Sequence, residues 1–340
     1  NGGSVQGGAM EIQGDSMGLV ATKPKIQNCM FTNCYVQGGD GGDGDNGNQD
    51  HPEGWDGGWA GYGHGGAVYG STYADPVFER CHFEGCYAQG GSGGDGGNGQ
   101  QASHGGRGGN LVWPDLIEQS MIDDWWDGWE NGPYEDYWRY SGHGGAVCFR
   151  ADSSPTFIQC NFNKSWTSGG LCGVGGSTSN TPPRAYRIDN FGGAVYADQR
   201  CSLDFVDCNF TYSYAAWDQE PNAVDGDDGT QPQDIYVSMG GTIAVEKDTR
   251  LNLTRCKVVG SYAAMGGAVY GLNSEILLTG TEVRDCNAYQ GGGLHTSECT
   301  GTLDGVTFAK NRAEFVFLYE PDDTDPNILV PVFDPGIILT

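Results

Sequence analysis

The sequence predicts an all-β protein, a right-handed parallel β-helix (solenoid) of about seven rungs, with long Gly- and Trp-rich insertions at one corner. Three observations predict it. A Gly-Gly pair recurs at a fixed distance from a cysteine, apolar residues keep the same place in each copy of the repeat, and every insertion falls at the same point of the repeat. Such self-similarity is typical of architectures in which stacked copies share one core.

The repeat is clearest in residues 192–213, GGAVYADQRCSLDFVDCNFTYS. An apolar triplet follows the Gly pair, and two short runs of alternating apolar and polar residues come after a polar turn. Alternation is typical of half-buried strands, so we predict three short strands in each copy. One copy is too small to bury its own apolar face, and stacking on the next copy would bury it.

The spacing between the Gly pair and the cysteine defines seven copies, numbered here from the N-terminus. It is 15 residues in four copies: Gly66 to Cys81, Gly145 to Cys160, Gly193 to Cys208 and Gly241 to Cys256. It is one residue shorter from Gly267 to Thr281 and from Gly292 to Val306. The first copy, from Gly8 to Cys29, has about six extra residues in its turn.

Aligning the copies places apolar residues in shared columns, which a parallel stack requires because equivalent strands lie about 4.8 Å apart. One column comprises Phe31, Phe83, Phe162, Phe210, Val258, Val283 and Phe308. A coil wound around its own core covers the inner face that parallel strands need covered, and the crossover rule makes it right-handed. The alternative, an antiparallel meander, would not give neighbouring strands the same columns.

The copies divide the chain into a solenoid over residues 1–313 and a C-terminal tail over residues 314–340. The insertions cover residues 38–63, 90–142, 167–191 and 215–239. Equivalent corners of stacked copies lie in a line, so we expect the insertions to form one layer on one side of the solenoid. The tail is apolar and interrupted by Pro and Asp, and we expect it to cap the last strand edge or to pair with another molecule.

Composition and charge limit the classes of partner. The chain has 59 glycines among 340 residues and a net charge of −27. Nucleic acids and anionic membranes need a basic face, so we expect neither as a partner. No apolar run is long enough for a membrane span. The chain begins with Asn1, and we expect a processed product or part of a longer protein.

The 12 cysteines fall largely into two inward columns. Equivalent residues of neighbouring rungs are close enough for a disulfide, which makes three bridges feasible: Cys29–Cys81, Cys160–Cys208 and Cys34–Cys86. The alternative is a dry stack of free thiols, because free cysteine packs as a small hydrophobe. Both interpretations stay open at this point.

All nine tryptophans lie at or in the insertions. A surface that binds glycans or a protein partner is one interpretation, since aromatic rings serve as platforms and anchors. The candidate residues are Trp55, Trp59, Trp125, Trp126, Trp129 and Trp138. The alternative is that long loops use tryptophan to build a small core of their own.

The first two insertions open with Gly-rich runs that contain G-G-x-G-x-D, ending on Asp43 and Asp95. This matches the start of a calcium-binding nonapeptide, so Asp40, Asp43 and Asp95 are candidate calcium ligands. The large apolar residue that should follow the Asp is missing. The alternative is that the glycine runs lie side by side as extended, polyproline-II-like segments joined by backbone hydrogen bonds.

His64 and His143 each precede a Gly pair and occupy the same column. No pair of carboxylates suited to glycoside hydrolysis lies on nearby outward positions, and candidate lyase bases are scattered. We therefore assign no catalytic residue and expect the chain not to be an enzyme.

The segments Pro76-Val-Phe-Glu-Arg-Cys-His-Phe and Pro155-Thr-Phe-Ile-Gln-Cys-Asn-Phe, each preceded by Gly-Gly-Ala-Val, resemble the repeats of bacterial surface proteins. These are right-handed parallel β-helix repeats of the polymorphic outer membrane protein type, with GGA[IVL] and FxxN motifs. The resemblance covers residues 1–313 apart from the insertions. It departs at FxxN, where only Phe308 to Asn311 keeps the Asn.

The resemblance implies an extracellular or cell-surface protein with a structural or adhesive role. We expect a fibre or surface-layer subunit that self-associates through its ends or sides, with glycans as further candidate ligands and calcium as an accessory ion. Two alternatives stay open, because a fold does not fix a function: a polysaccharide lyase or hydrolase of the pectin-lyase-like fold, and a non-catalytic carbohydrate-binding module.

Overall fold

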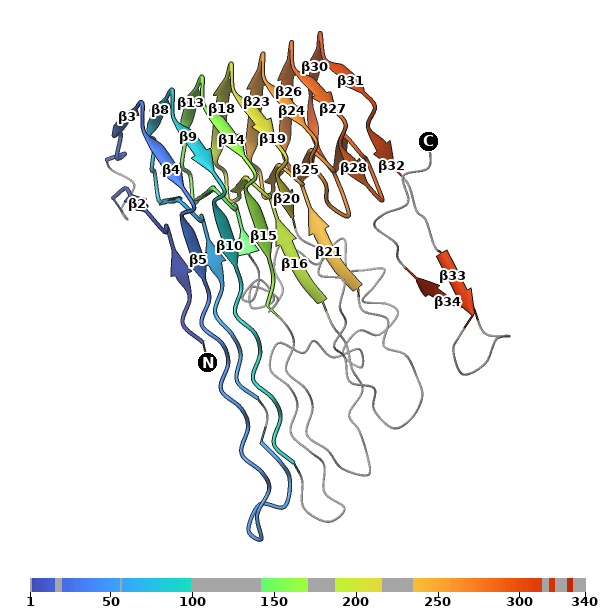
Figure 1. Ribbon diagram of the computed structural model, residues 1–340. Coiled ribbons are helices and arrows are strands. Elements are labelled where there is room, and N and C mark those ends of the chain that lie inside the picture. The colour runs from blue at the N-terminus through green and yellow to red at the C-terminus, as the bar shows by residue number, and fades with distance from the viewer. Residues whose placement is uncertain are drawn as a thin grey trace.

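The computed structural model describes residues 2–15, 20–55, 57–98, 142–170, 187–215, 235–313, 318–321 and 329–332. Across these residues the chain is all-β, without helices, and nearly all strands pair in parallel. Strands from successive copies of the repeat lie side by side in long rows (Figure 1). This arrangement is consistent with a solenoid.

Three sheets have seven strands each, one from every copy. Sheet I follows the Gly pairs and contains β2 (Met10–Gln13), β7 (Val68–Ser71), β12 (Val147–Arg150), β17 (Val195–Ala197), β22 (Ile243–Val245), β25 (Val269–Leu272) and β29 (Leu294–Ser297). Sheet II contains β3 (Lys25–Gln27), β8 (Val77–Glu79), β13 (Thr156–Ile158), β18 (Ser202–Val206), β23 (Arg250–Thr254), β26 (Glu275–Thr279) and β30 (Thr300–Asp304). Sheet III contains β4 (Met30–Thr32), β9 (His82–Glu84), β14 (Asn161–Asn163), β19 (Asn209–Thr211), β24 (Lys257–Val259), β27 (Glu282–Arg284) and β31 (Thr307–Ala309).

Two shorter sheets add strands that the sequence did not predict. Sheet IV precedes the Gly pairs and contains β1 (Val5–Gln6), β6 (Gly63–His64), β11 (Gly142–His143), β16 (Arg187–Phe191) and β21 (Ile235–Met239). Sheet V follows sheet III and contains β5 (Tyr35–Gln37), β10 (Tyr87–Gln89), β15 (Trp166–Ser168) and β20 (Tyr214–Ala215). A full copy therefore has five strands, in the order IV, I, II, III, V, and not the predicted three. Most of these strands border an insertion.

The last copies finish with shorter pairings. β28 (Asn287–Ala288) pairs in parallel with β32 (Arg312–Ala313). In the tail, β33 (Leu318–Pro321) and β34 (Leu329–Val332) form an antiparallel pair. The described part of the chain contains no helix long and apolar enough to cross a membrane.

The predicted columns are confirmed. Phe31 pairs with Phe83, Phe83 with Phe162 and Phe162 with Phe210, all in parallel register. Their rings stack with centroids 4.7, 4.6 and 4.8 Å apart. Phe78, Phe157 and Phe205 form a second stack in sheet II. The two stacks meet edge to face, an arrangement that aromatic pairs favour, and they form the centre of the core.

The Gly pair has a steric cause. Gly65 adopts a left-handed backbone with φ of 67°, which residues with a Cβ rarely adopt. A Cβ on the next residue, Gly66, would lie 2.1 Å from the Gly145 oxygen and 2.4 Å from the Tyr87 oxygen. The chain therefore turns from sheet IV into sheet I through two residues without side chains, close to the Gly pair of the next copy and to β10.

Candidate functional surfaces

Four sets of side chains and backbone could carry a function: the cysteine columns, a buried polar cluster around two histidines, an outward stack of aromatic rings, and the Gly-rich insertions. Each is built by the same register that aligns the strands. Their positions decide whether they are available to a ligand.

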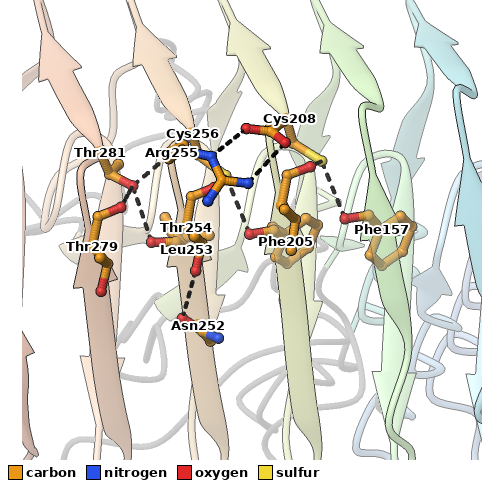
Figure 2. A network of polar contacts seen from close by, with 12 residues as sticks. Phe157, Phe205, Cys208, Asn252, Leu253, Thr254, Arg255, Cys256, Thr279 and Thr281 are labelled. Atoms are coloured by element: carbon orange, nitrogen blue, oxygen red, sulfur yellow. Dashed lines mark hydrogen bonds and ion pairs between the residues drawn. The ribbon is translucent and has the colours of Figure 1, made fainter.

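The cysteines of the inward column form a ladder of thiol hydrogen bonds (Figure 2). Cys208 Sγ donates to the Phe157 oxygen in the preceding copy at 3.4 Å and to the Val206 oxygen at 3.4 Å. Cys256 repeats this with the Phe205 oxygen at 3.4 Å, and the Thr281 hydroxyl donates to the Leu253 oxygen at 3.0 Å. Cys, Thr and Asn side chains thus all donate to a backbone oxygen of the preceding copy. In the second column, Asn311 Nδ2 donates to the Val283 oxygen at 2.8 Å. At the Asn position of FxxN in the second copy, Cys86 makes the equivalent bond, because its Sγ donates to the Phe31 oxygen at 3.5 Å.

All cysteines in the described part of the chain are free thiols. The feasible bridges Cys29–Cys81, Cys34–Cys86 and Cys160–Cys208 stay predictions. Burial raises the pKa of the Cys81 thiol to about 11 and that of Cys86 to about 12, against hydrogen bonds from their neighbours. Both thiols are therefore neutral near pH 7 and poor nucleophiles or metal ligands.

His64 and His143 stack on each other with ring centroids 4.5 Å apart, and both are buried. Their column continues in Phe191, Met239 and Met265, and it packs against the outward side chains of sheet I, including Tyr69 and Tyr196. Burial, followed by the charges of neighbouring basic groups, holds the pKa of both imidazoles well below 6.5. The pair belongs to a second apolar cluster between sheets IV and I.

Two basic and two acidic residues, which together carry no net charge, adjoin this cluster. Arg150 Nε and Nη2 donate to both carboxylate oxygens of Asp198 at 2.9 Å, and the Asp198 side chain is 1% exposed. Lys247 Nζ lies 4.0 Å from the same carboxylate. The Tyr196 hydroxyl donates to Glu246 Oε2 at 3.0 Å, and burial raises the pKa of Tyr196. The two acids are held by partners from neighbouring copies, so this cluster joins copies together.

An aromatic stack that the sequence analysis missed runs along the outer face of sheet V. Its rings are nearly parallel, with centroid distances of 5.0, 4.3, 6.1 and 4.9 Å along Tyr35, Tyr87, Trp166, Tyr214 and Tyr262. The signal was available, because each ring directly follows the second Cys/Ser column. Internal rings give both faces to their neighbours. A sugar, which stacks on a ring face, could reach only Tyr35 and Tyr262 at the ends, which are 55% and 46% exposed.

The Gly-rich segments form a bundle held by backbone hydrogen bonds every third residue. Gly41, Gly44 and Gly47 donate to Ser92, Asp95 and Asn98, each at 2.7 Å. Gly91, Gly94 and Gly97 donate to Gly61, Gly58 and Trp55 at 2.9 to 3.0 Å. A period of three is that of a polyproline-II helix, and these segments lie side by side as extended traces (Figure 1). The glycine-packing alternative is confirmed.

The candidate calcium ligands take part in this bundle. Asp40 Oδ1 accepts from the Ser92 amide at 2.8 Å, and Asp43 Oδ1 accepts from the Asp95 amide at 3.0 Å. Asp40 and Asp43 are one turn apart, about 9 Å along a polyproline-II axis. Among the described residues no group of three His, Cys, Asp or Glu is placed to hold a metal. Calcium stays a prediction, with Asp40, Asp43 and Asp95 as its candidate ligands.

Two of the candidate tryptophans lie on this bundle, where Trp55 is 58% and Trp59 is 44% exposed. Their backbone oxygens accept hydrogen bonds from Gly97 and Gly2. Trp125, Trp126, Trp129 and Trp138 lie outside the described residues.

The two ends of the stack differ. In the first copy the inward Ile26 and Phe31 are 9% and 7% exposed. In the last copy the inward Leu303 and Phe308 are 51% and 44% exposed, and every residue of β30 is exposed. The described residues thus leave an apolar face open at the C-terminal end.

Comparison with known proteins gives no relative from which a function could be transferred. No protein-family model, no curated protein and no solved structure matches the chain.

Proposed function

We propose that the sheets close into one right-handed parallel β-helix of about seven rungs, and that the chain is an extracellular structural or adhesive protein. Its solenoid is a rigid support, and its insertions form the presented surface. The observation that carries this proposal is that many side chains make their contacts with a neighbouring copy. Cysteines, aromatic rings and charged residues contact the equivalent or adjacent residues of that copy. Groups held in this way stiffen a rod.

Several contacts on the outside support the same role. Arg200 and Arg255 each make two hydrogen bonds to an aspartate of the preceding copy, Asp152 and Asp207, at 2.8 to 2.9 Å. Bidentate pairs of this kind fix orientation between the copies they join. The Gly bundle extends the support outward, because its hydrogen bonds link the first two insertions to each other and to residues 2–3.

The test is product release. The purified full chain is incubated with neutral and acidic polysaccharides, with and without calcium, and reducing ends and unsaturated products are measured. The proposal expects no release above a buffer control. Release that disappears on removal of calcium would replace this proposal with the lyase alternative.

Glycan binding is a second candidate, favoured by the exposed rings of Trp55 and Trp59. The test compares glycan-array binding of the full chain with Trp55→Ala and Trp59→Ala. Met30→Ala, which removes another exposed apolar side chain in β4 of sheet III, is the matched control. Binding that only the tryptophan variants lose supports this candidate, and equal binding by all three variants removes it.

A further inference from the structure

We propose that the open C-terminal copy is a self-association surface, through which two copies of this chain meet end to end about a two-fold axis. The surface consists of the last copy, residues 294–313, with Leu303 and Phe308 at its centre. The proposal goes beyond the proposed function, which needs only a single rigid rod.

The first step is the open core. Leu303 and Phe308 continue the inward columns of Leu278 and Val283, which are 0% and 1% exposed. The half-buried Leu294, Cys299 and Val306 pack against the core beside them. The last copy therefore offers a contiguous apolar face of the composition that the copies bury between themselves. Such faces mark interaction sites.

The second step is the strand edge. β29, β30 and β31 each pair with a strand of the sixth copy on one side, and they are the terminal strands of sheets I, II and III. A terminal strand keeps unpaired N–H and C=O groups that another chain can use. The contact thus offers hydrogen bonds together with apolar burial.

The third step is charge. The chain carries −27, yet the last copy holds two acidic residues, Glu298 and Asp304, and two basic residues, Lys310 and Arg312. Two copies approaching through net-negative faces repel each other, and residues 294–313 themselves add no net charge to that repulsion. Across a two-fold axis the acids of one copy can face the bases of the other, which favours a second copy over an unrelated partner.

The fourth step decides the geometry. The first copy is also neutral, with Glu11 and Asp15 against Lys23 and Lys25. Its inward Ile12, Ile26 and Phe31 are nonetheless at most 9% exposed. A head-to-tail fibre needs exposed inward side chains at both ends, and among the described residues they are exposed at the C-terminal end alone. Contact between two C-terminal ends uses that end in both copies and closes the assembly at two.

The experiment measures association of the full chain by sedimentation equilibrium over a range of concentrations. A monomer–dimer equilibrium is expected. Leu303→Glu and Phe308→Glu place a charge in the contact and should weaken dimerisation at least about tenfold. Met30→Glu is the matched control, because Met30 is 73% exposed in the first copy. It should leave dimerisation unchanged. Circular dichroism checks that each variant keeps its strands.

Chemical cross-linking identifies the ends that meet. Equal amounts of ¹⁴N- and ¹⁵N-labelled chain are mixed and treated with an amine-reactive cross-linker. The proposal expects mixed-isotope links between Lys310 of the two copies, since Lys310 is exposed in the last copy. Mixed-isotope links from Lys310 to Lys25 would show head-to-tail stacking and overturn the proposal. A full chain that stays monomeric at every concentration, as when its own tail covers the open end, would also overturn it.

Discussion

The first and last copies of the repeat have the same columns but different surroundings. Phe31 and Phe308 occupy equivalent places in sheet III, yet Phe31 is 7% exposed and Phe308 is 44% exposed. The sequence also distinguishes the two copies, because the first has the longer turn between its Gly pair and its cysteine and the last has Val306 in place of that cysteine. The difference teaches that a column in the sequence predicts which way a side chain points. How much that side chain stabilises the fold depends on the neighbours that cover it on each side.

In a stacked array, stability is close to a sum of terms for each copy and for each contact between neighbours. An internal copy has two such contacts and a terminal copy has one, unless another segment or molecule covers it. The same substitution should therefore cost different amounts along one column. The predictions below use this expectation, from the largest effect to the smallest.

The largest effect is expected from shortening the phenylalanine stack. Phe162 is fully buried between Phe83 and Phe210, so Phe162→Ala should destabilise the fold by about 3–5 kcal/mol. Phe308→Ala should cost about 1 kcal/mol or less, because much of that side chain is already in water. Phe31→Ala should lie near the Phe162 variant. Urea denaturation of the three variants measures the order, and equal losses at Phe31 and Phe308 would remove the difference between the ends.

Acid should destabilise the second and third copies, in which His64 and His143 precede the Gly pairs. Burial keeps the pKa of His64 and His143 well below 6.5, so the folded chain stays unprotonated where the unfolded chain binds protons. Above pH 6.5 the histidines do not lower the free energy of unfolding. Below pH 6.5 this free energy falls by about 1.4 kcal/mol per pH unit for each histidine. Denaturation midpoints between pH 6.5 and 5 measure this fall.

The matched control for the acid effect is replacement of both histidines by Phe, which occupies the same column as Phe191. The doubly substituted chain should lose most of the pH dependence over this range. If its midpoint falls with pH as steeply as that of the unmodified chain, the histidines are not the cause.

The Gly bundle gives the N-terminal copies a second set of contacts. A Cβ on Gly41 would lie 1.8 Å from the Gly58 oxygen, whereas a Cβ on Gly42 meets nothing within 4 Å. Gly41→Ala should therefore separate the segments at a cost on the order of 1–3 kcal/mol, and Gly42→Ala should be close to neutral. Limited proteolysis between residues 38 and 61 reads out the opening of the bundle. Similar cleavage of the two variants would contradict the close packing at Gly41.

The smallest effect is expected in the thiol ladder. Cys256→Thr should change stability little, because Thr281 fills the same column in the next copy with the same hydrogen bonds. Cys256→Ala loses the thiol's hydrogen bonds and should cost about 1 kcal/mol. Thermal melting of the two variants measures the difference. A Thr variant that melts below the Ala variant would show that size, and not hydrogen bonding, sets the column.

The sequence predicted the parts of the fold that repeat. Constant spacing from Gly pair to cysteine was sufficient to place Phe83, Phe162 and Phe210 in one stack, because a parallel register preserves spacing. The glycine-packing alternative for residues 38–47 was also correct, since a side chain every third residue would block the hydrogen bonds.

The parts that the sequence analysis missed depend on contacts between copies. The buried pair of Arg150 and Asp198 joins residues 48 positions apart whose types differ from copy to copy, so no column indicates it. The strands of sheets IV and V are short and lie beside variable insertions. The columns show that no copy follows the seventh, but they do not reveal whether another segment covers Leu303 and Phe308.

Amide hydrogen exchange, followed by mass spectrometry on the full chain at several concentrations, tests the difference between the ends most directly. The account predicts that peptides covering β3 and β4 exchange slowly at every concentration. Peptides covering β30 and β31 should exchange quickly at high dilution and slow down as the concentration rises. Equal exchange at the two ends under dilution, or slowing of the first copy with concentration, would contradict it.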